Sequence, residues 1–200
     1  MTGSTSGIAS GGFQNTFGGW VYDGFLVKFD AVGNRLWATY YGGNGIDYAT
    51  DVATDASGNV YLVGDVETST IGVIASGGFQ NSKVGTRNHF LVKFEPNGNR
   101  LCATYYGQSY ETNPSVAVDN AGNVYLGGCT YASTGIASGG FQNVLGGSYD
   151  AFLVKFTSCA TPLSTTISST DNICNSQCTG TATATPIGGM SPYTYSWNTT

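Results

Sequence analysis

Charged side chains are scarce in this sequence. Lys, Arg, Asp and Glu make up 10% of its 200 residues, against roughly 25% in an average soluble protein. The net charge of −5 argues against nucleic-acid binding, which needs a basic face. The single His, His89, has no recurring Ser or Cys partner, so the sequence offers no candidate catalytic triad.

Long apolar runs and helical periodicity are also missing. No run approaches the roughly 18 residues of a membrane span. The first residues, MTGSTSG, lack the basic and apolar regions of a signal peptide. They begin inside a repeat, so this absence does not bear on export. No helix is predicted, and GGNG at 42–45 lacks the Lys-Ser/Thr and the helix of a phosphate loop.

Gly and aromatic residues are abundant, with 30 Gly, 13 Tyr, 10 Phe and 3 Trp. Together with Val and Thr they are typical of short strands joined by tight turns, and disorder is not expected over most of the chain. Several motifs recur. ASGGFQN begins at 9, 75 and 137, and FLVKF begins at 25, 90 and 152. A period of this size indicates an array of similar structural units.

Each unit predicts four antiparallel strands. In the first unit FLVKF alternates apolar and polar faces, DAVGN forms a turn, and RLWATYY is the return strand. YATDVATD and VYLVGDV, joined by ASGN, complete the four. Four-stranded meanders in tandem are propeller blades, and we expect two complete blades, at 25–66 and 90–130. A solenoid of hairpins is the structural alternative, although its repeats are usually shorter.

The run FLVKF, D-x-x-GN, RLxATYYGG, D-x-SGNVYLVG and ASGGFQN resembles the bacterial β-propeller repeat called SBBP, over about residues 3–156. The resemblance implies an extracellular or cell-surface protein of Bacteroidetes-like bacteria, with no assigned catalytic residues. The expected fold class is therefore all-β, with a β-propeller repeat region at 1–156.

The propeller is expected to be incomplete. MTGSTSG is similar to the end of a fourth strand, and the third FLVKF, at Phe152–Phe156, has no return strand after it. Two blades would leave open edges. We expect either a fragment of a longer protein or copies that assemble into a ring. Phe152–Phe156 also suits the closing strand of a parent propeller.

The sequence changes character after Phe156. We expect a Ser/Thr-rich linker at 157–171 and a truncated module at 172–200, in which TGTATATPIGG pairs with PYTYSW as a hairpin. The pattern C-x-G-x-A-x-A-x-P-x-GG-x-x-PYTYSW resembles an SprB-type repeat, similar to PKD and immunoglobulin-like sandwiches. That resemblance implies a modular surface protein of the gliding-motility kind, often exported by type IX secretion.

Five Cys residues do not define a disulfide framework. Cys102 replaces Trp37 of the first unit and is expected as a small core residue, and Cys129 stands in the place of Asp65. An odd number of Cys leaves the pairing open. If the protein is exported, we expect a disulfide that involves one or more of the remaining three: Cys159, Cys174 and Cys178.

The recurring polar residues are expected to build the fold. We expect turn capping by the Asp of each D-x-x-G-N motif rather than calcium binding, which needs more acidic ligands. The mid-strand Lys residues are expected to extend to solvent or to pair with Asp23, Asn88 or Asp150, with ligand contact in a pore as the alternative. These residues are Asp30, Asp55 and Asp119 for the turns, and Lys28, Lys93 and Lys155 for the strands.

His89 is expected to be a surface loop residue, because Gly24 and Ala151 occupy its place in the other units. Two Tyr-Tyr pairs are expected in the core, with sugar stacking as the alternative. They are Tyr40 with Tyr41 and Tyr105 with Tyr106. No residue is expected to be catalytic, to bind a cofactor or to hold a metal.

We expect a non-enzymatic scaffold for adhesion, which binds an extracellular protein or glycan through loops where the units differ. The differing segments are 66–73 against 130–135, and 82–88 against 16–22. No nucleic acid and no membrane span is expected, and the blades should need parent-protein blades or self-association to close. The alternatives are a structural spacer of a surface stalk and an accessory propeller of an extracellular hydrolase or lyase.

Overall fold

The structure is a computed structural model that describes residues 1–19, 21–67, 74–157, 164–170, 180–187 and 195–196. The chain divides into two compact units, Met1–Cys159 and Ala160–Thr200. The described residues of both units form strands and turns without a helix, which confirms the all-β fold class. Within this part of the chain, no helix is long and apolar enough to span a membrane.

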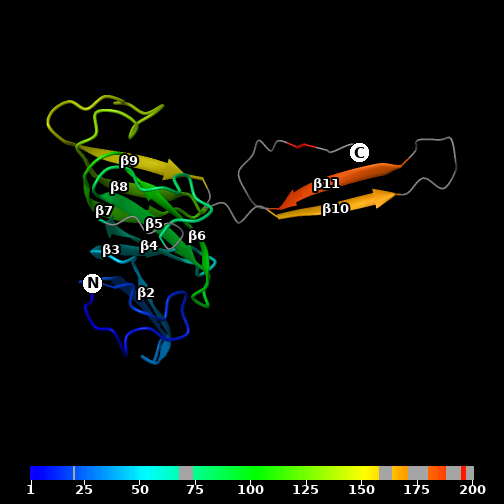
Figure 1. Cartoon of the computed structure of the whole chain (residues 1–200), viewed down its shortest axis with the longest axis horizontal. Coiled ribbons are helices and arrows are strands. Elements are labelled where there is room, and N and C mark those ends of the chain that lie inside the picture. The colour runs from blue at the N-terminus through cyan, green and yellow to red at the C-terminus, as the bar shows by residue number, and fades with distance from the viewer. Residues whose placement is uncertain (20, 68–73, 158–163, 171–179, 188–194, 197–200) are drawn as a thin grey trace. The chain divides into compact units, whose positions relative to one another are not determined.

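Antiparallel sheets follow one another through the first unit (Figure 1). A two-stranded sheet is followed by a four-stranded sheet and a three-stranded sheet, each with its strands in chain order. The strands are β1 (Gly24–Phe29), β2 (Arg35–Tyr41), β3 (Asp47–Thr54), β4 (Val60–Val66), β5 (Asn88–Phe94), β6 (Arg100–Tyr106), β7 (Glu111–Val118), β8 (Val124–Thr130) and β9 (Asp150–Phe156).

The blades are grouped differently from the sequence prediction. The complete blade is β3-β4-β5-β6, so strand pairing continues from β4 to β5 and stops between β2 and β3. The expected blades at 25–66 and 90–130 therefore each take two strands from one sheet and two from the next, so their boundaries do not coincide with the sheets. The reason is that a repeat period fixes the length of a unit but not where it starts. The short β2–β3 connection joins two sheets, whereas the longer β4–β5 connection joins paired strands.

The ASGGFQN motif covers the edge of a sheet. In the complete blade, Ser76 exchanges two backbone hydrogen bonds with Ala103 of β6, each 2.9 Å long, and Tyr105 N donates to Gln80 O at 2.8 Å. The first copy binds β2 in the same way, through Ser10 with Ala38 and Gln14 with Tyr40. The motif therefore acts as a short additional strand that protects an otherwise open edge.

The turns between strands are capped as expected. Asp30 Oδ1 accepts the backbone N–H of Val32 and Asn34, and Oδ2 accepts the side-chain amide of Asn34. Asp55 and Asp119 repeat this pattern in their own turns. Since these carboxylates are satisfied by the turn itself, their presence in every unit is explained by folding.

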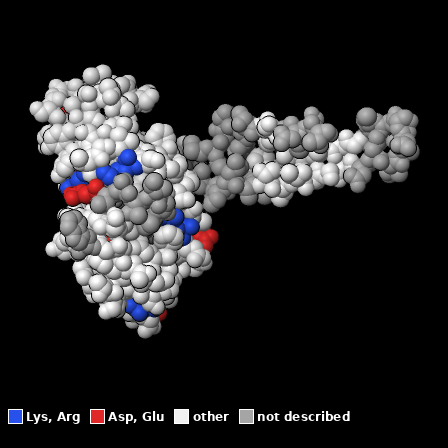
Figure 2. Space-filling view, in the orientation of Figure 1, with Lys and Arg blue, Asp and Glu red and all other residues white. Residues whose placement is uncertain are grey.

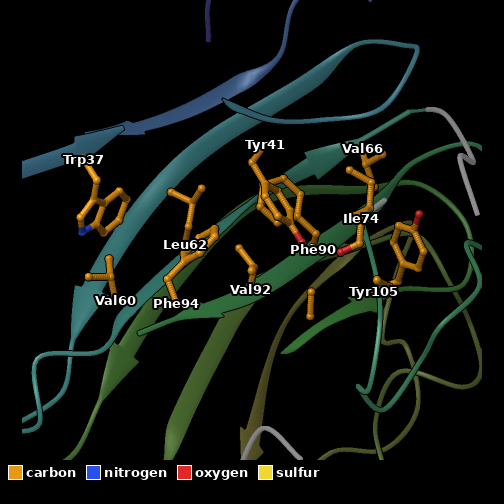
Figure 3. Packing of buried hydrophobic residues seen from close by; sticks show 12 residues of the cluster. Trp37, Tyr41, Val60, Leu62, Val66, Ile74, Phe90, Val92, Phe94 and Tyr105 are labelled. Carbon is orange, nitrogen blue, oxygen red and sulfur yellow. Dashed lines mark hydrogen bonds between the residues drawn. The ribbon is translucent and has the colours of Figure 1, made fainter. Parts of the chain in front are cut away.

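Two hydrophobic clusters cover the two faces of the complete blade. One joins it to the β1-β2 sheet and includes Trp37, Tyr41 and Phe94, which point toward one another in Figure 3. The other joins it to the β7-β8-β9 sheet and includes Tyr106 and Leu126. All seven residues of β4 are buried. Burial on both faces explains why these strands carry so few charges.

The second unit holds β10 (Ser164–Thr170), which pairs with β11 (Thr181–Ile187). The linker predicted at 157–171 is therefore a strand over residues 164–170, because STTISST has enough β-branched residues to form one, whereas 158–163 and 171 lie outside the described residues. The strand in TGTATATPIGG is confirmed, and it pairs with β10. Most of PYTYSW lies outside the described residues.

Candidate functional site

The segments that differ between repeat units meet at one rim of the sheets. In the complete blade the start of β3, the end of β4 and the start of β5 lie side by side, because Asp47 pairs with Val66 and Val66 pairs with Asn88. In the next sheet Glu111, Thr130 and Asp150 are aligned in the same way. Residues directly beyond these strand ends therefore share one surface.

A hollow of about 580 Å³ opens at this rim of the complete blade. It is lined by residues that follow β4, precede β5 or join β6 to β7: Glu67, Lys83, Gly85, Thr86, Arg87 and Tyr110. Lys83 Nζ donates to the carbonyl oxygens of Gly85 and Thr86 at 2.7 and 2.8 Å. Burial lowers the pKa of Lys83, against the opposing charges of the two Glu residues at 67 and 111.

Arg87 is fixed in the wall of the hollow. Its Nη2 lies 2.6 Å from Asp65 Oδ2, and its Nη1 lies 3.6 Å from Glu67 Oε1. The guanidinium lies between two aromatic rings, 5.4 Å from the centroid of Tyr48 and 5.5 Å from that of Tyr110. Two aromatic rings and two carboxylates therefore hold the guanidinium in one position.

A row of tyrosine rings continues from Arg87 along the rim. Tyr110 and Tyr131 meet edge to face with centroids 5.9 Å apart, and Tyr131 stacks on Tyr149 at 5.2 Å. These three rings, which we call the tyrosine ladder, are 42%, 47% and 54% exposed. Tyr110 comes from the β6–β7 connection, and Tyr131 and Tyr149 come from the two ends of the β8–β9 connection, so the blade framework brings the rings together. Exposed aromatic surface of this extent is a feature of binding sites.

The ladder and Arg87 occupy positions whose residue changes between units. Arg87 lies directly before Asn88, where the other units have Tyr22 and Tyr149. Tyr110 lies directly before Glu111, where the first unit has Ile46 before Asp47. The bridges Tyr22 to Ile46 and Arg87 to Tyr110 confirm that these positions are equivalent. The scaffold therefore repeats while this surface varies.

His89 is not on the surface, contrary to the prediction. It lies in β5, is fully buried, and its Nδ1 is 2.6 Å from Asp65 Oδ1, so Asp65 joins His89 to Arg87. His89 Nε2 has no hydrogen-bond partner among the described residues. The next sheet pairs Cys129 with Ala151 at this position. Sequence alignment missed the role of His89 because its partner, Asp65, is also specific to this blade.

A pair of buried carboxyl groups lies below the same rim in the first repeat. Asp23 and Asp47 are both fully buried. Their free oxygens have no hydrogen-bond partner within the described structure. Burial raises the pKa of Asp23, and burial raises the pKa of Asp47 to about 7, with a further contribution from the charge of Asp23.

The complete blade has an amide in this place. Asn88 and Glu111 occupy the equivalent positions, and Asn88 Nδ2 donates to Glu111 Oε2 at 3.0 Å. Glu111 also accepts hydrogen bonds from the backbone of the β6–β7 loop and from Thr130. The pair at 23 and 47 has no such N–H between its carboxyl groups, and burial favours the protonated form of both by raising the pKa of each.

The mid-strand Lys residues do not pair with the expected partners. Lys28 donates to Pro96 O at 2.9 Å, and Lys93 lies 3.6 Å from Asp55 and over the ring of Tyr61. Lys155 lies over the ring of Tyr125. The predicted partners instead accept backbone N–H groups from nearby loops. Asp23 accepts that of Gly18, Asn88 that of Val84, and Asp150 that of Gly146. Their strand ends bring them next to these loops rather than next to Lys.

The two Tyr-Tyr pairs are buried, as expected for core packing. Their second members hold the following repeat in place, because Tyr41 donates to Ile74 O and Tyr106 donates to Ile136 O. Cys102 is buried as predicted, but it is also disulfide-bonded, whereas Cys129 is free. The described residues contain no group of three or more His, Cys, Asp or Glu that could hold a metal ion.

The family model described as a β-propeller repeat, SBBP, matches residues 36–65. This range runs from β2 through β4, so it crosses from one sheet into the next. No curated protein matches the chain. The repeat match and the succession of antiparallel four-stranded and partial sheets agree, and both support a β-propeller-type arrangement of the first unit.

Proposed function

We propose that this protein is a non-enzymatic β-propeller scaffold of the bacterial cell surface that binds neutral glycans at the tyrosine ladder and the adjoining hollow. The observation that carries the proposal is the ladder itself, in which three half-exposed rings continue the cation–π stack of Arg87. A sugar offers hydroxyl groups for hydrogen bonding and an apolar ring face, and tyrosine matches both.

The charges around the hollow support a neutral ligand. Lys83 and Arg87 are balanced by Glu67 and by Asp65 behind the wall. Figure 2 shows that charged groups are few on the viewed face and lie in small clusters on an otherwise uncharged surface. A strongly anionic or cationic polymer would find no extended complementary field here.

The carboxyl groups support binding without turnover. Most glycoside hydrolases need two carboxyl groups on either side of the scissile bond. Among the described residues that line the hollow, only Glu67 carries one. Asp65 is buried and already paired with both Arg87 and His89.

The surface location is supported by the repeat type and by the disulfide bond at Cys102, because disulfides persist in oxidising compartments. We propose that the second unit begins an SprB-type, immunoglobulin-like repeat of a modular adhesin from Bacteroidetes-like bacteria. A spacer without a ligand would not need a pre-organised ladder of exposed rings.

Replacing Tyr131 with Ala is expected to reduce glycan affinity on the order of tenfold, because Tyr131 contacts both neighbours in the ladder. The measurement is binding of the purified chain to an array of neutral and acidic glycans. Tyr22→Ala is the matched control, since Tyr22 is 39% exposed at the position equivalent to Tyr149 but lies outside the ladder. Equal loss in both variants, or no glycan binding by the wild type, would contradict the proposal.

A further inference from the structure

β9 lacks the neighbour that its two counterparts have. β1 pairs with β2 and β5 pairs with β6, but in the described chain β9 pairs with β8 alone. The difference is visible in burial, because Leu91 of β5 is 2% exposed and the equivalent Leu153 of β9 is 75% exposed. The strand β10, which follows β9, pairs with β11 instead.

The third ASGGFQN segment, residues 137–143, is already in the conformation that binds a strand. Asn143 Nδ2 donates to Gly140 O at 3.1 Å, and the same bond joins Asn81 to Gly78 at 3.0 Å in the complete blade. The Gln side chain is also held alike, with Gln142 Nε2 donating to Val144 O at 3.0 Å. The aromatic side chain of this segment, Phe141, is however fully exposed.

One glycine shows that this segment has room for a strand. A Cβ added to Gly78 would lie 2.5 Å from Ala103 O and from Thr104 Cβ of β6, and Gly12 is equally close to β2. At Gly140, the nearest atom to such a Cβ is Asn143 Oδ1, 3.9 Å away. In the first two copies a neighbouring strand lies so close to the glycine that a Cβ would not fit. In the third copy no strand of the described residues lies beside Gly140.

We propose that the free edge of β9 and the segment 137–143 together bind a β-strand of the sequence type R-L-x-A-T-Y-Y, supplied by another polypeptide. The two complete instances in this chain define the occupant, since both place this sequence between an FLVKF strand and an ASGGFQN segment. Strand addition of this kind gains affinity from main-chain hydrogen bonds and specificity from the alternating side chains.

The register of the bound strand follows from β5 and β6. Phe90 pairs with Tyr105 and Leu91 with Thr104, so the first Tyr of the incoming strand should face Phe152 and its Thr should face Leu153. The carbonyl of Gln142 should accept the N–H of that Tyr, as the Gln80 carbonyl does at 2.8 Å. Both edges of the strand would then be satisfied.

The test is binding of the full chain to a fluorescently labelled synthetic peptide, GNRLWATYYGG, which copies residues 33–43. Fluorescence anisotropy should show saturable binding, and hydrogen exchange should slow at the backbone amides of β9 and of 137–143. Gly140→Ala should weaken binding at least tenfold, because the added methyl group would collide with the strand. Gly147→Ala is the control, since a Cβ there meets nothing within 4 Å.

Neither variant should disturb the unliganded fold, which circular dichroism would check, because both added methyl groups enter open space. A peptide with an N-methyl group on its first Tyr should bind as weakly as a scrambled peptide. Absence of saturable binding, or equal affinity of Gly140→Ala and wild type, would overturn the proposal. So would a dimer of the free chain that Gly140→Ala dissociates, because a second copy would then occupy the edge.

Discussion

Replacing Asp23 with Asn is expected to stabilise the protein at pH 8 by about 2–4 kcal/mol. The amide would supply the N–H that Asn88 gives to Glu111 in the complete blade. It would also remove one of two buried carboxyl groups that converge on Gly42, where an added Cβ would lie 2.6 Å from Asp23 Oδ1 and 2.9 Å from Asp47 Oδ2. Asn can still accept the backbone N–H of Gly18, as Asn88 accepts that of Val84.

The wild-type protein should accordingly lose stability as the pH rises from about 4 to about 7. The pKa of Asp47 is near 3.8 in the unfolded chain and is raised to about 7 in the folded protein. The folded state therefore binds more protons in this range, and the free energy of unfolding falls as the pH rises. Carboxyl groups with a lowered pKa, such as Asp30 and Asp119, act in the opposite direction but at lower pH.

Urea unfolding at pH 5 and pH 8 measures both effects. The Asp23→Asn variant should show a smaller difference between the two pH values than the wild type. Asp150→Asn is the matched control, because Asp150 accepts the equivalent backbone bond from Gly146 but lies in the incomplete sheet. A wild-type protein that is more stable at pH 8 than at pH 5 would contradict the account.

Removal of the Asp65 carboxylate is expected to destabilise the fold by about 3–5 kcal/mol, because it leaves the buried His89 and Arg87 without their shared partner. Asp65 is 1% exposed, so water cannot replace the lost contacts without local opening. Chemical denaturation of Asp65→Ala measures the loss. Glu67→Ala is the control and should lower the free energy of unfolding by less than about 1 kcal/mol, because Glu67 lies farther from Arg87 than Asp65 does and is more exposed.

The double variant Asp65→Cys/His89→Ala should be more stable than Asp65→Ala alone. It copies the pair Cys129 and Ala151, which the next sheet uses at this position. The double variant removes both the carboxylate and the imidazole, so no buried imidazole is left without a hydrogen-bond partner. An unsatisfied imidazole should account for most of the stability lost in Asp65→Ala. If Asp65→Ala costs no more than Glu67→Ala, the Asp65 network does not stabilise this blade.

The strands could be predicted from the sequence, whereas their grouping into sheets could not. Alternation in FLVKF and the D-x-x-G-N turns locate strands because both are local signals. Whether β4 pairs with β5 depends on the connection between Val66 and Asn88, which contains ASGGFQN. That motif has little β-propensity, and its role appears only when Ser76 and Gln80 bind the edge of β6. The strand β10 was missed because STTISST is as polar as a linker.

The rim that holds the hollow could be anticipated from the sequence, whereas the tyrosine ladder could not. The variable segments 66–73 and 82–88 contain five of the six described residues that line the hollow, so the comparison of units pointed to this rim. The tyrosine ladder was missed because its members are far apart in the sequence: Tyr110 lies in the β6–β7 connection, and Tyr131 and Tyr149 lie at opposite ends of the β8–β9 connection. A comparison of the residues that precede Asp23, Asn88 and Asp150 would have indicated these side chains, since Tyr, Arg and Tyr occur there.

We propose that the recurring residues build the blades and that the rim residues, which vary between units, bind a ligand. NMR titration of the isotopically labelled chain with cellohexaose, a neutral hexasaccharide, tests this directly. The largest chemical-shift changes should fall at residues 83–87 and at Tyr110, Tyr131 and Tyr149, with the core around Tyr41 and Phe94 unchanged. Shift changes spread over the recurring residues, or none at millimolar sugar, would contradict it.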